Sequence, residues 1–173
     1  MNPNESMRIE QLCIRFPGTP ETIALLHLSL SLEKGKTLAI VGESGSGKSM
    51  TALALMGLLP PNAIWSGKIQ FQSDKNIVSI TQNSSKQSWH EVRGRLASMV
   101  FQDPMTALNP VMKIGHQLRE AIKAQHKISS RKAKALTLEW LEKVKLPTPK
   151  KLYHRYPHQI SGGQKQRVVI AMA

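Results

Sequence analysis

The sequence predicts an α/β protein that begins with antiparallel strands, continues through a strand, a glycine-rich loop and a helix, and ends in a group of helices. Three observations lead to this prediction. Apolar residues tend to occupy every second position in the first 32 residues, which is typical of half-buried strands. A short apolar run then precedes a glycine-rich loop. In the last third, apolar residues recur every three or four positions, as in amphipathic helices.

The first expected elements are strands at 7–16 and 23–32, separated by the turn-forming sequence PGTP at 17–20. We expect these strands to pair as an antiparallel hairpin or meander. The run TLAIV at 37–41 predicts a third strand, buried on both faces of a sheet. A segment of good helix formers, 48–59, comes after the glycine-rich loop and stops at two prolines, so we expect a helix there.

Turn-forming residues separate short apolar pieces between positions 62 and 95, which predicts short strands and exposed loops. The run SMVF at 98–101 predicts another buried strand, which cannot continue through Pro104.

Two amphipathic helices are expected next, around 114–122 and 133–144. Ser129 or Ser130 is expected to cap the second of them, because a serine side chain accepts a hydrogen bond from the first turn of a helix. The last helical element begins at Ser161 and runs to the end of the sequence.

Length and composition exclude several classes of protein. The 173 residues fit one compact domain or a piece of a larger one, and 40% apolar residues exclude a chain that is disordered throughout. The longest apolar run, 52–59, has eight residues, whereas a membrane-spanning helix needs about 20. The first 25 residues lack the pattern of a secretory signal. The single cysteine, Cys13, excludes an internal disulfide and fits a reducing cytosol.

The net charge of +13 is distributed unevenly. Residues 1–110 contain 10 Lys or Arg and 8 Asp or Glu, whereas residues 111–173 contain 14 and 3. A basic segment of this kind indicates a nucleic-acid or anionic-lipid surface, or a sequence that stops before its acidic part.

The strongest motif is GESGSGKS at 42–49, which matches the phosphate-binding pattern G-x-x-x-x-G-K-[ST] at every fixed position. Glycines let backbone N–H groups turn toward phosphate oxygens, and the helix after the loop presents its N-terminus to the same anion. The lysine is expected on the β- and γ-phosphates, and the final serine hydroxyl on Mg²⁺. A glycine-rich surface turn is the alternative. The candidate phosphate-binding residues are Gly42, Ser44, Gly45, Gly47, Lys48 and Ser49.

A second candidate anion site is SGGQ at 161–164. A serine followed by two glycines at the start of a helix offers a hydroxyl and free N–H groups. Because the first loop already holds one nucleotide, the second site suggests contact with a nucleotide held by another subunit. A flexible helix cap without a ligand is the alternative interpretation.

Three ordered motifs resemble those of the ATP-binding-cassette (ABC) transporter ATPases. GESGSGKS at 42–49 resembles the Walker A motif, FQDP at 101–104 the Q-loop, and ISGGQKQR at 160–167 the signature motif, with Ile in place of the usual Leu. The segments ALALMGLLP at 52–60 and FQDPMTALNP at 101–110 are similar to ATPase subunits of bacterial dipeptide, oligopeptide and nickel importers.

The resemblance implies ATP and Mg²⁺ as ligands and assigns roles to further residues. Gln102 would reach Mg²⁺ or the attacking water, and Phe16 would stack on adenine; a core Phe at a strand end is the alternative. Lys48 and Gln102 are the implied catalytic residues, and Ser49 and Gln102 the implied metal ligands. The residues implied to contact the γ-phosphate in the opposite subunit are Ser161, Gly162, Gly163 and Gln164.

The resemblance also implies an assembly and a domain plan. The expected partners are a second ATPase subunit, identical or not, transmembrane permease subunits and, indirectly, a periplasmic or lipid-anchored solute-binding protein, at the cytoplasmic face of the inner membrane. The whole sequence, 1–173, would be a partial nucleotide-binding domain. It would comprise a β subdomain with the phosphate-loop core at 7–101, a helical subdomain at 103–160 and the start of the signature helix at 161–173.

The family continues after the signature to an apolar strand ending in Asp-Glu, the Walker B strand, and then to a histidine. The sequence as given ends at Ala173, before any of these residues. We therefore expect it to lack the general base and to be inactive alone. Two alternatives stay open: an ABC-type ATPase that acts on nucleic acid, which the basic last third favours but the lack of interleaved aromatic residues does not, and a non-catalytic nucleotide-binding remnant.

Overall fold

The structure is a computed structural model that describes residues 1–73, 76–103 and 107–173. The chain forms two compact units, 1–98 and 99–173. Pro104 of the expected Q-loop turn lies outside the described residues, as do Met105 and Thr106.

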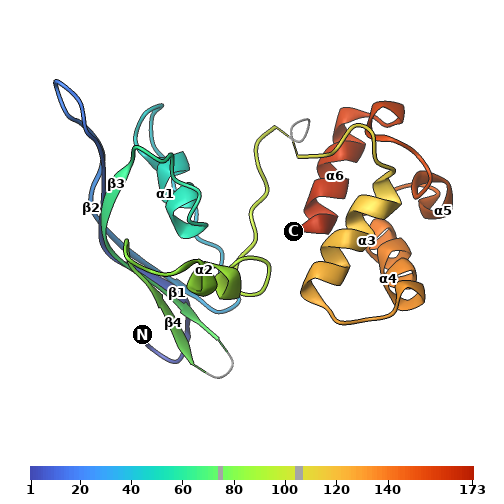
Figure 1. The fold of residues 1–173 in the computed structure, drawn as a ribbon, viewed down its shortest axis with the longest axis horizontal. Helices are drawn as coiled ribbons and strands as arrows, with labels where there is room; N and C mark the ends of the chain where they lie inside the picture. The colour runs from blue at the N-terminus through green and yellow to red at the C-terminus, as the bar shows by residue number, and fades with distance from the viewer. Residues whose placement is uncertain (74–75, 104–106) are drawn as a thin grey trace. The chain divides into compact units, whose positions relative to one another are not determined.

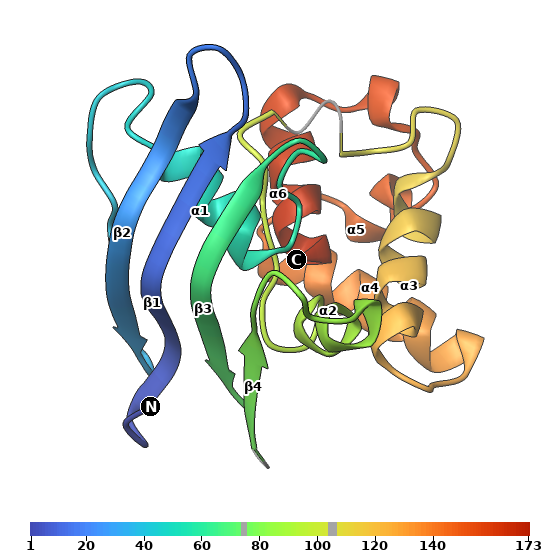
Figure 2. The same ribbon diagram turned by 60° about the vertical axis from the view of Figure 1, so that its left-hand side comes forward.

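The first unit contains a four-stranded antiparallel sheet. Its strands are β1 (Glu5–Phe16), β2 (Thr22–Glu33), β3 (Ile64–Gln72) and β4 (Ile77–Ile80), in the order β2-β1-β3-β4 (Figure 2). The prediction of an antiparallel start, with short strands after residue 62, is confirmed. Alternation of apolar residues predicted β1 and β2 correctly because alternate side chains of a strand point to the same face, and one face of this sheet packs on the core cluster.

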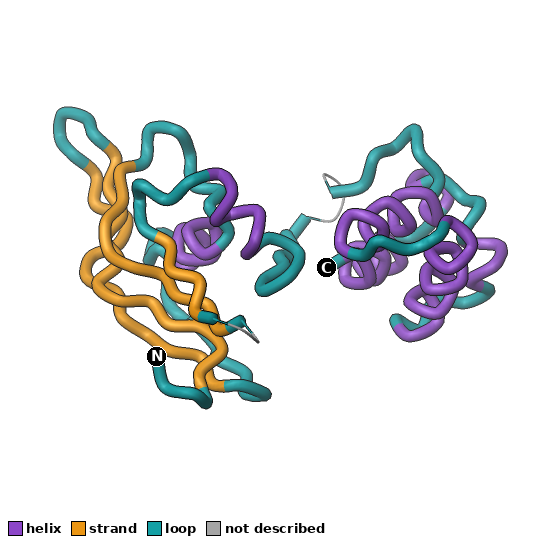
Figure 3. The backbone as a smooth tube through the Cα atoms, turned by 60° about the horizontal axis from the view of Figure 1, so that its bottom comes forward, coloured by secondary structure: helices purple, strands orange, loops and turns teal. Residues whose placement is uncertain are grey.

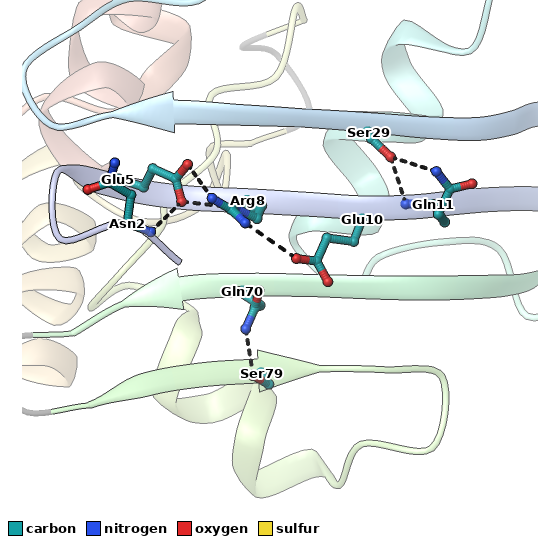
Figure 4. Close-up of polar contacts among 8 residues, drawn as sticks. All are labelled: Asn2, Glu5, Arg8, Glu10, Gln11, Ser29, Gln70 and Ser79. Atoms are coloured by element: carbon teal, nitrogen blue, oxygen red, sulfur yellow. Dashed lines mark hydrogen bonds and ion pairs between the residues drawn. The ribbon is translucent and has the colours of Figure 1, made fainter.

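Polar contacts join neighbouring strands of this sheet and tie β1 to the residues before it (Figure 4). The Arg8 guanidinium donates to both oxygens of Glu5, at 2.6 and 2.9 Å, and the Glu5 carboxylate also accepts from the backbone N–H of Asn2 at 3.0 Å. Charge-assisted hydrogen bonds from Arg8 therefore lower the pKa of Glu5 below its ordinary value of 4.5. The contact ties the start of β1 to the chain that precedes it.

Two helices, α1 (Lys48–Leu55) and α2 (Lys86–Val92), lie on one side of the sheet (Figure 1). Ala54 of α1 and Val92 of α2 belong to the same buried cluster as the inward-facing side chains of the strands. The other buried members of this cluster are Ile9, Leu12, Ile14, Ile69, Phe71, Val78 and Ile80. The phosphate-loop helix is thus anchored on the antiparallel sheet.

The two other strands expected in this region are not formed, and the prediction that they are buried was wrong. Segments 37–41 and 98–101 have no regular structure, and Val41 is 88% exposed. A central strand of a sheet is held by ladder bonds to its neighbours, and among the described residues no segment pairs with either run. Apolar composition alone does not make a strand where the pairing partner is missing.

The helix expected at 48–59 is confirmed but ends at Leu55. Gly57 takes a left-handed conformation with φ of +60°, and the N–H of Leu58 donates to the carbonyl of Leu53 at 2.8 Å. This hydrogen bond reverses the chain after the helix, which is a common way for glycine to end one. The helix therefore stops before the prolines that were expected to stop it.

The second unit is helical: among its described residues no strand is present (Figure 3). Its elements are α3 (Ile114–Gln125), α4 (Ser130–Lys143), α5 (Pro149–Leu152), the 3₁₀ helix η1 (Pro157–Gln159) and α6 (Gly162–Met172). Both expected amphipathic helices are confirmed. Their apolar faces enclose one core, which consists of Leu108, Ile114, Leu118, Ile122, Ala133, Leu141, Leu146, Leu152, Ile160, Val168 and Val169.

The ends of α3 and α4 are fixed in different ways. Of the two serines expected as caps of α4, Ser129 is the cap, and it accepts a hydrogen bond from the N–H of Lys132 at 3.3 Å. No side chain caps α3; instead, the N–H of Ile114 and of Gly115 donate to backbone carbonyls of residues 153–155, at 2.8 and 3.0 Å. A Cβ at Gly115 would collide with the ring of Tyr153, so glycine allows this close approach.

In the parts of the chain that the structure covers, no helix is both long and apolar enough to cross a bilayer.

Candidate phosphate-binding site

The glycine-rich loop connects the irregular segment 37–41 to the N-terminus of α1. Gly45 and Gly47 adopt left-handed conformations, with φ of +83° and +85°, and the N–H of Ser46 donates to the carbonyl of Glu43 at 3.3 Å. Left-handed glycines turn the loop back on itself so that α1 can begin at Lys48. The helix has no acidic residue in its first turn, so its positive N-terminal end is not neutralised locally.

Gly47 fixes the loop against strand β2. A Cβ built on Gly47 would lie 2.7 Å from the carbonyl oxygen of Ala24 and 2.9 Å from Cδ1 of Leu25. A Cβ on Gly45 would meet no atom within 4 Å. The loop therefore needs glycine at 45 for its backbone conformation only, and at 47 for both conformation and space.

A cavity of about 340 Å³ lies in the loop and is lined by Ala24 and the residues from Ser44 to Met50. The Lys48 ammonium donates to the carbonyls of Gly42 and Glu43, at 2.8 and 2.6 Å, and to Oγ of Ser46 at 3.2 Å. Within the described residues no carboxylate pairs with Lys48. Its charge is held only by neutral acceptors, so it remains available to an anion in the cavity.

Ser49 lies in the first turn of α1 and is exposed. The described residues contain no group of three His, Cys, Asp or Glu side chains arranged to hold a metal ion. A lone hydroxyl fits Mg²⁺, which keeps several waters and takes its other ligands from the phosphates it accompanies. The residues present are therefore compatible with Mg²⁺ bound together with a nucleotide, and not with a metal site made by protein alone.

Phe16 lies at the end of β1, opposite Thr22 of β2. It is half-buried and packs against the core cluster of the first unit, and it does not line the cavity of the phosphate loop. The structure therefore brings the loop residues from Ser44 to Ser49 together around the cavity, with the Gly42 carbonyl bound to Lys48, and leaves Phe16 outside it.

Gln102 is exposed, in a bend at the start of the second unit, next to the exposed Phe101. Asn109, shortly after it, is organised by a residue that the sequence did not single out. The buried Gln117 of α3 accepts from the N–H of Asn109 at 2.9 Å and donates to the carbonyls of Asn109 and Met112, at 2.9 and 2.8 Å. The sequence feature that indicates this role of Gln117 is its position on the apolar side of an amphipathic helix.

Ser161 is the N-cap of α6 and forms a capping box with Gln164. Its Oγ accepts from the N–H of Gln164 at 3.3 Å, and Oε1 of Gln164 accepts from the N–H of Ser161 at 3.1 Å. Gly162 and Gly163 are exposed, with open space where a Cβ would lie. Their N–H groups belong to the first turn, which has no acceptor within the helix, so they are the donors that remain for an anion.

Comparison with known proteins identifies the family. The family model described as ABC transporter matches residues 25–173. The chain belongs to the ABC transporter family. The predicted fold class, the α/β phosphate-loop fold of the ABC ATPases, is confirmed by a solved dimeric ATP-binding cassette bound to ADP and Pi, which has a TM-score of 0.78. That likeness covers 96% of this chain and 68% of the cassette, at 24% sequence identity.

Relatives of this ABC protein include peptide importer subunits, as expected from the sequence. It is 47% identical to the oligopeptide transport ATP-binding protein OppD of Bacillus subtilis over 96% of the chain. It is 42% identical to the glutathione import ATP-binding protein GsiA of Escherichia coli over 100% of the chain. The chain spans 46% of the length of OppD and 28% of the length of GsiA.

Proposed function

We propose that this chain is part of an ATP-binding subunit of a bacterial ABC importer that couples ATP binding and hydrolysis to the uptake of peptides or nickel. The observation that carries the proposal is the phosphate loop, where Lys48 and the N-terminus of α1 line one cavity. Among the described residues, Lys48 binds backbone carbonyls and pairs with no carboxylate. The names of OppD and GsiA support peptides as the class of solute.

In this proposal the backbone N–H groups of 42–49 hold the β- and γ-phosphates of ATP. Lys48 leaves its carbonyl acceptors to contact the same phosphates, and the exposed Ser49 hydroxyl becomes a ligand of Mg²⁺. Gln102 would act on Mg²⁺ or on the attacking water, since its amide both accepts and donates. Phe16 would contact adenine; the alternative, a core residue at the end of β1, is supported by its packing against the buried cluster.

The signature residues act on a second nucleotide. Ser161, Gly162 and Gly163 would contact the γ-phosphate bound by the opposite ATPase subunit, identical or not, with Gln164 holding the cap in shape. In functional terms the β subdomain with its phosphate-loop core spans 7–101, the helical subdomain 103–160 and the signature helix starts at 161.

The proposed place of the subunit is the cytoplasmic face of the inner membrane, bound peripherally to transmembrane permease subunits. A periplasmic or lipid-anchored solute-binding protein would be an indirect partner. A second candidate, an ABC ATPase that acts on nucleic acid, is favoured by the 14 basic against 3 acidic residues in 111–173. Tight DNA binding that weakens steeply as salt rises would support that alternative.

The test is ATP binding to the intact protein with Lys48→Ala, and with Lys36→Ala as a matched control. Both substitutions remove one lysine charge, but Lys36 is exposed, does not line the loop cavity and makes no hydrogen bond with its side chain in the described residues. We expect Lys48→Ala to weaken binding of Mg-ATP at least tenfold, because a charge-assisted phosphate contact is worth about 1.5–3 kcal/mol. Lys36→Ala should bind as the wild type does.

Equal ATP affinity in the two variants would refute the assignment of the loop. ATP binding without ATP-dependent solute uptake, measured with the protein and its permease in vesicles, would refute the importer function while leaving the loop in place. Turnover that vanishes in Lys48→Ala would distinguish an active ATPase from a non-catalytic remnant.

A further inference from the structure

The far end of α1 is held by an arginine from a distant part of the first unit. Arg93 comes directly after α2, and its Nε donates to the carbonyl of Met56 at 2.8 Å while its Nη2 donates to the carbonyl of Gly57 at 2.7 Å. These carbonyls lie at the end of α1, where helix carbonyls lack N–H donors within the helix and the helix dipole is negative. A forked cation suits such a site better than any neutral group.

Trp89 of α2 completes this contact. The Arg93 guanidinium lies over the Trp89 ring, 5.6 Å from its centroid, and a Cβ at Gly57 would lie 2.6 Å from the same ring. The left-handed Gly57 therefore lets the indole approach the end of α1 closely enough to support the arginine. Together these groups limit how the end of α1 can tilt.

The helix that is held in this way is short. It has 8 residues, so its length is about 12 Å, and it begins at Lys48 and Ser49. One end is fixed where Gly47 meets the carbonyl of Ala24, and the other where Arg93 binds. With both ends fixed, a displacement at Arg93 is transmitted to the phosphate loop rather than absorbed in a long helix.

We propose that Arg93 is a positioning residue for the phosphate site: by clamping the C-terminal end of α1 it sets the position of Lys48 and Ser49 relative to the bound phosphates. The inference rests on the proposed function of the loop in binding ATP. Arg93 touches no substrate in this role, and it acts only through α1.

The segment that carries Arg93 is a tight turn closed by backbone hydrogen bonds. The N–H groups of Leu96 and Ala97 donate to the carbonyl of Val92, at 2.9 and 3.1 Å, and the N–H of Gly94 donates to the carbonyl of Ala97 at 2.9 Å. Val92 is fully buried, so this tight turn is anchored in the core. A fixed turn is what a clamp requires, because a mobile one would not restrain the helix.

The experiment compares Arg93→Lys and Arg93→Met with Arg95→Met in the intact protein. Arg95 lies two residues away, is exposed and makes no side-chain hydrogen bond or ion pair within the described residues, so it matches the loss of charge without the clamp. Binding of a fluorescent ATP analogue with Mg²⁺ and the melting temperature are measured on the same samples. Lysine keeps the charge but offers a single nitrogen in place of the planar guanidinium, whose Nε and Nη2 each bind one carbonyl, so it isolates the geometry.

We expect both Arg93 variants to weaken nucleotide binding about tenfold, which corresponds to ~1.4 kcal/mol. Arg95→Met should stay within twofold of the wild type. If Arg93→Met does not fold, Arg93→Lys carries the comparison. An Arg93→Lys variant that melts at a lower temperature but binds nucleotide like the wild type would overturn the inference, because Arg93 would then stabilise the fold only. Failure of the wild type to bind nucleotide would instead refute the proposed function.

Discussion

Replacement of Gly47 by alanine should damage the phosphate site more than any other single methyl group in the loop. Two costs add at this position. A left-handed backbone costs a residue with a Cβ about 1–2 kcal/mol, and forcing a methyl group to within 2.7 Å of the Ala24 carbonyl adds about 1–3 kcal/mol of overpacking. The neighbouring atom belongs to the backbone of β2, which cannot rotate away as a side chain can. We therefore expect Gly47→Ala to lower the free energy of unfolding by about 2–5 kcal/mol.

Gly45→Ala is the matched control, since it has nearly the same φ but open space around the added Cβ. It should cost only the conformational part, about 1–2 kcal/mol. Urea unfolding of the intact variants gives both free energies, and ATP titration of the folded protein shows whether the loop has moved. We expect Gly47→Ala to abolish measurable ATP binding and Gly45→Ala to weaken it. Equal losses of stability in the two variants would refute the close approach of Gly47 to β2.

Two further predictions concern the helical unit and the sheet. Ser161→Ala and Ser129→Ala each remove a cap with the same 3.3 Å hydrogen bond, so each should cost about 1 kcal/mol in unfolding experiments. If the signature site contacts nucleotide, only Ser161→Ala should also lower the ATP turnover of the intact protein assembled with its partner subunits. An equal effect of both substitutions on turnover would argue that Ser161 is a cap alone. The lowered pKa of Glu5 means that its bond to Arg8 stabilises the fold above pH 4.5 and is lost as the pH falls through the lowered pKa. Glu5→Gln should therefore be less stable than the wild type at pH 7, with a difference that shrinks below pH 4.5, and a difference that does not change with pH would contradict this.

Local sequence predicted those elements whose burial pattern is set by their own periodicity. Strands β1 and β2 alternate because one face of the sheet is buried, and α3 and α4 show a 3.6-residue period because one face of each helix is buried. The cap of α4 was predicted as Ser129 or Ser130, and Ser129 could be recognised because the cap is made within three residues. In each case the signal and the interaction that it reports are close in sequence.

In the candidate site, too, the sequence predicted those features of the phosphate loop that depend on neighbouring residues. The motif at 42–49 specified the glycines, the lysine and the start of α1, all of which are local. No pattern in the sequence indicated that Gly47 lies against Ala24, that Arg93 reaches the carbonyls of α1, or that Gln117 binds the loop around Asn109. The first two join residues more than 20 positions apart, and Gln117 is a polar residue at a helical core position that no simple pattern distinguishes.

The wrong prediction of a strand at 37–41 indicates which interactions shape the phosphate loop. The run at 37–41 leads directly into the loop and was expected to be a strand buried on both faces of a sheet, yet it forms no strand and Val41 is exposed. The loop nevertheless keeps its left-handed glycines and its cavity. Its shape must then come from the other side, through Gly47 on β2 and through α1, whose buried Thr51 donates to the carbonyl of Gly47 at 3.0 Å. This is why variants at Gly47 and at the far end of α1 are more informative about the site than variants in the apolar run before it.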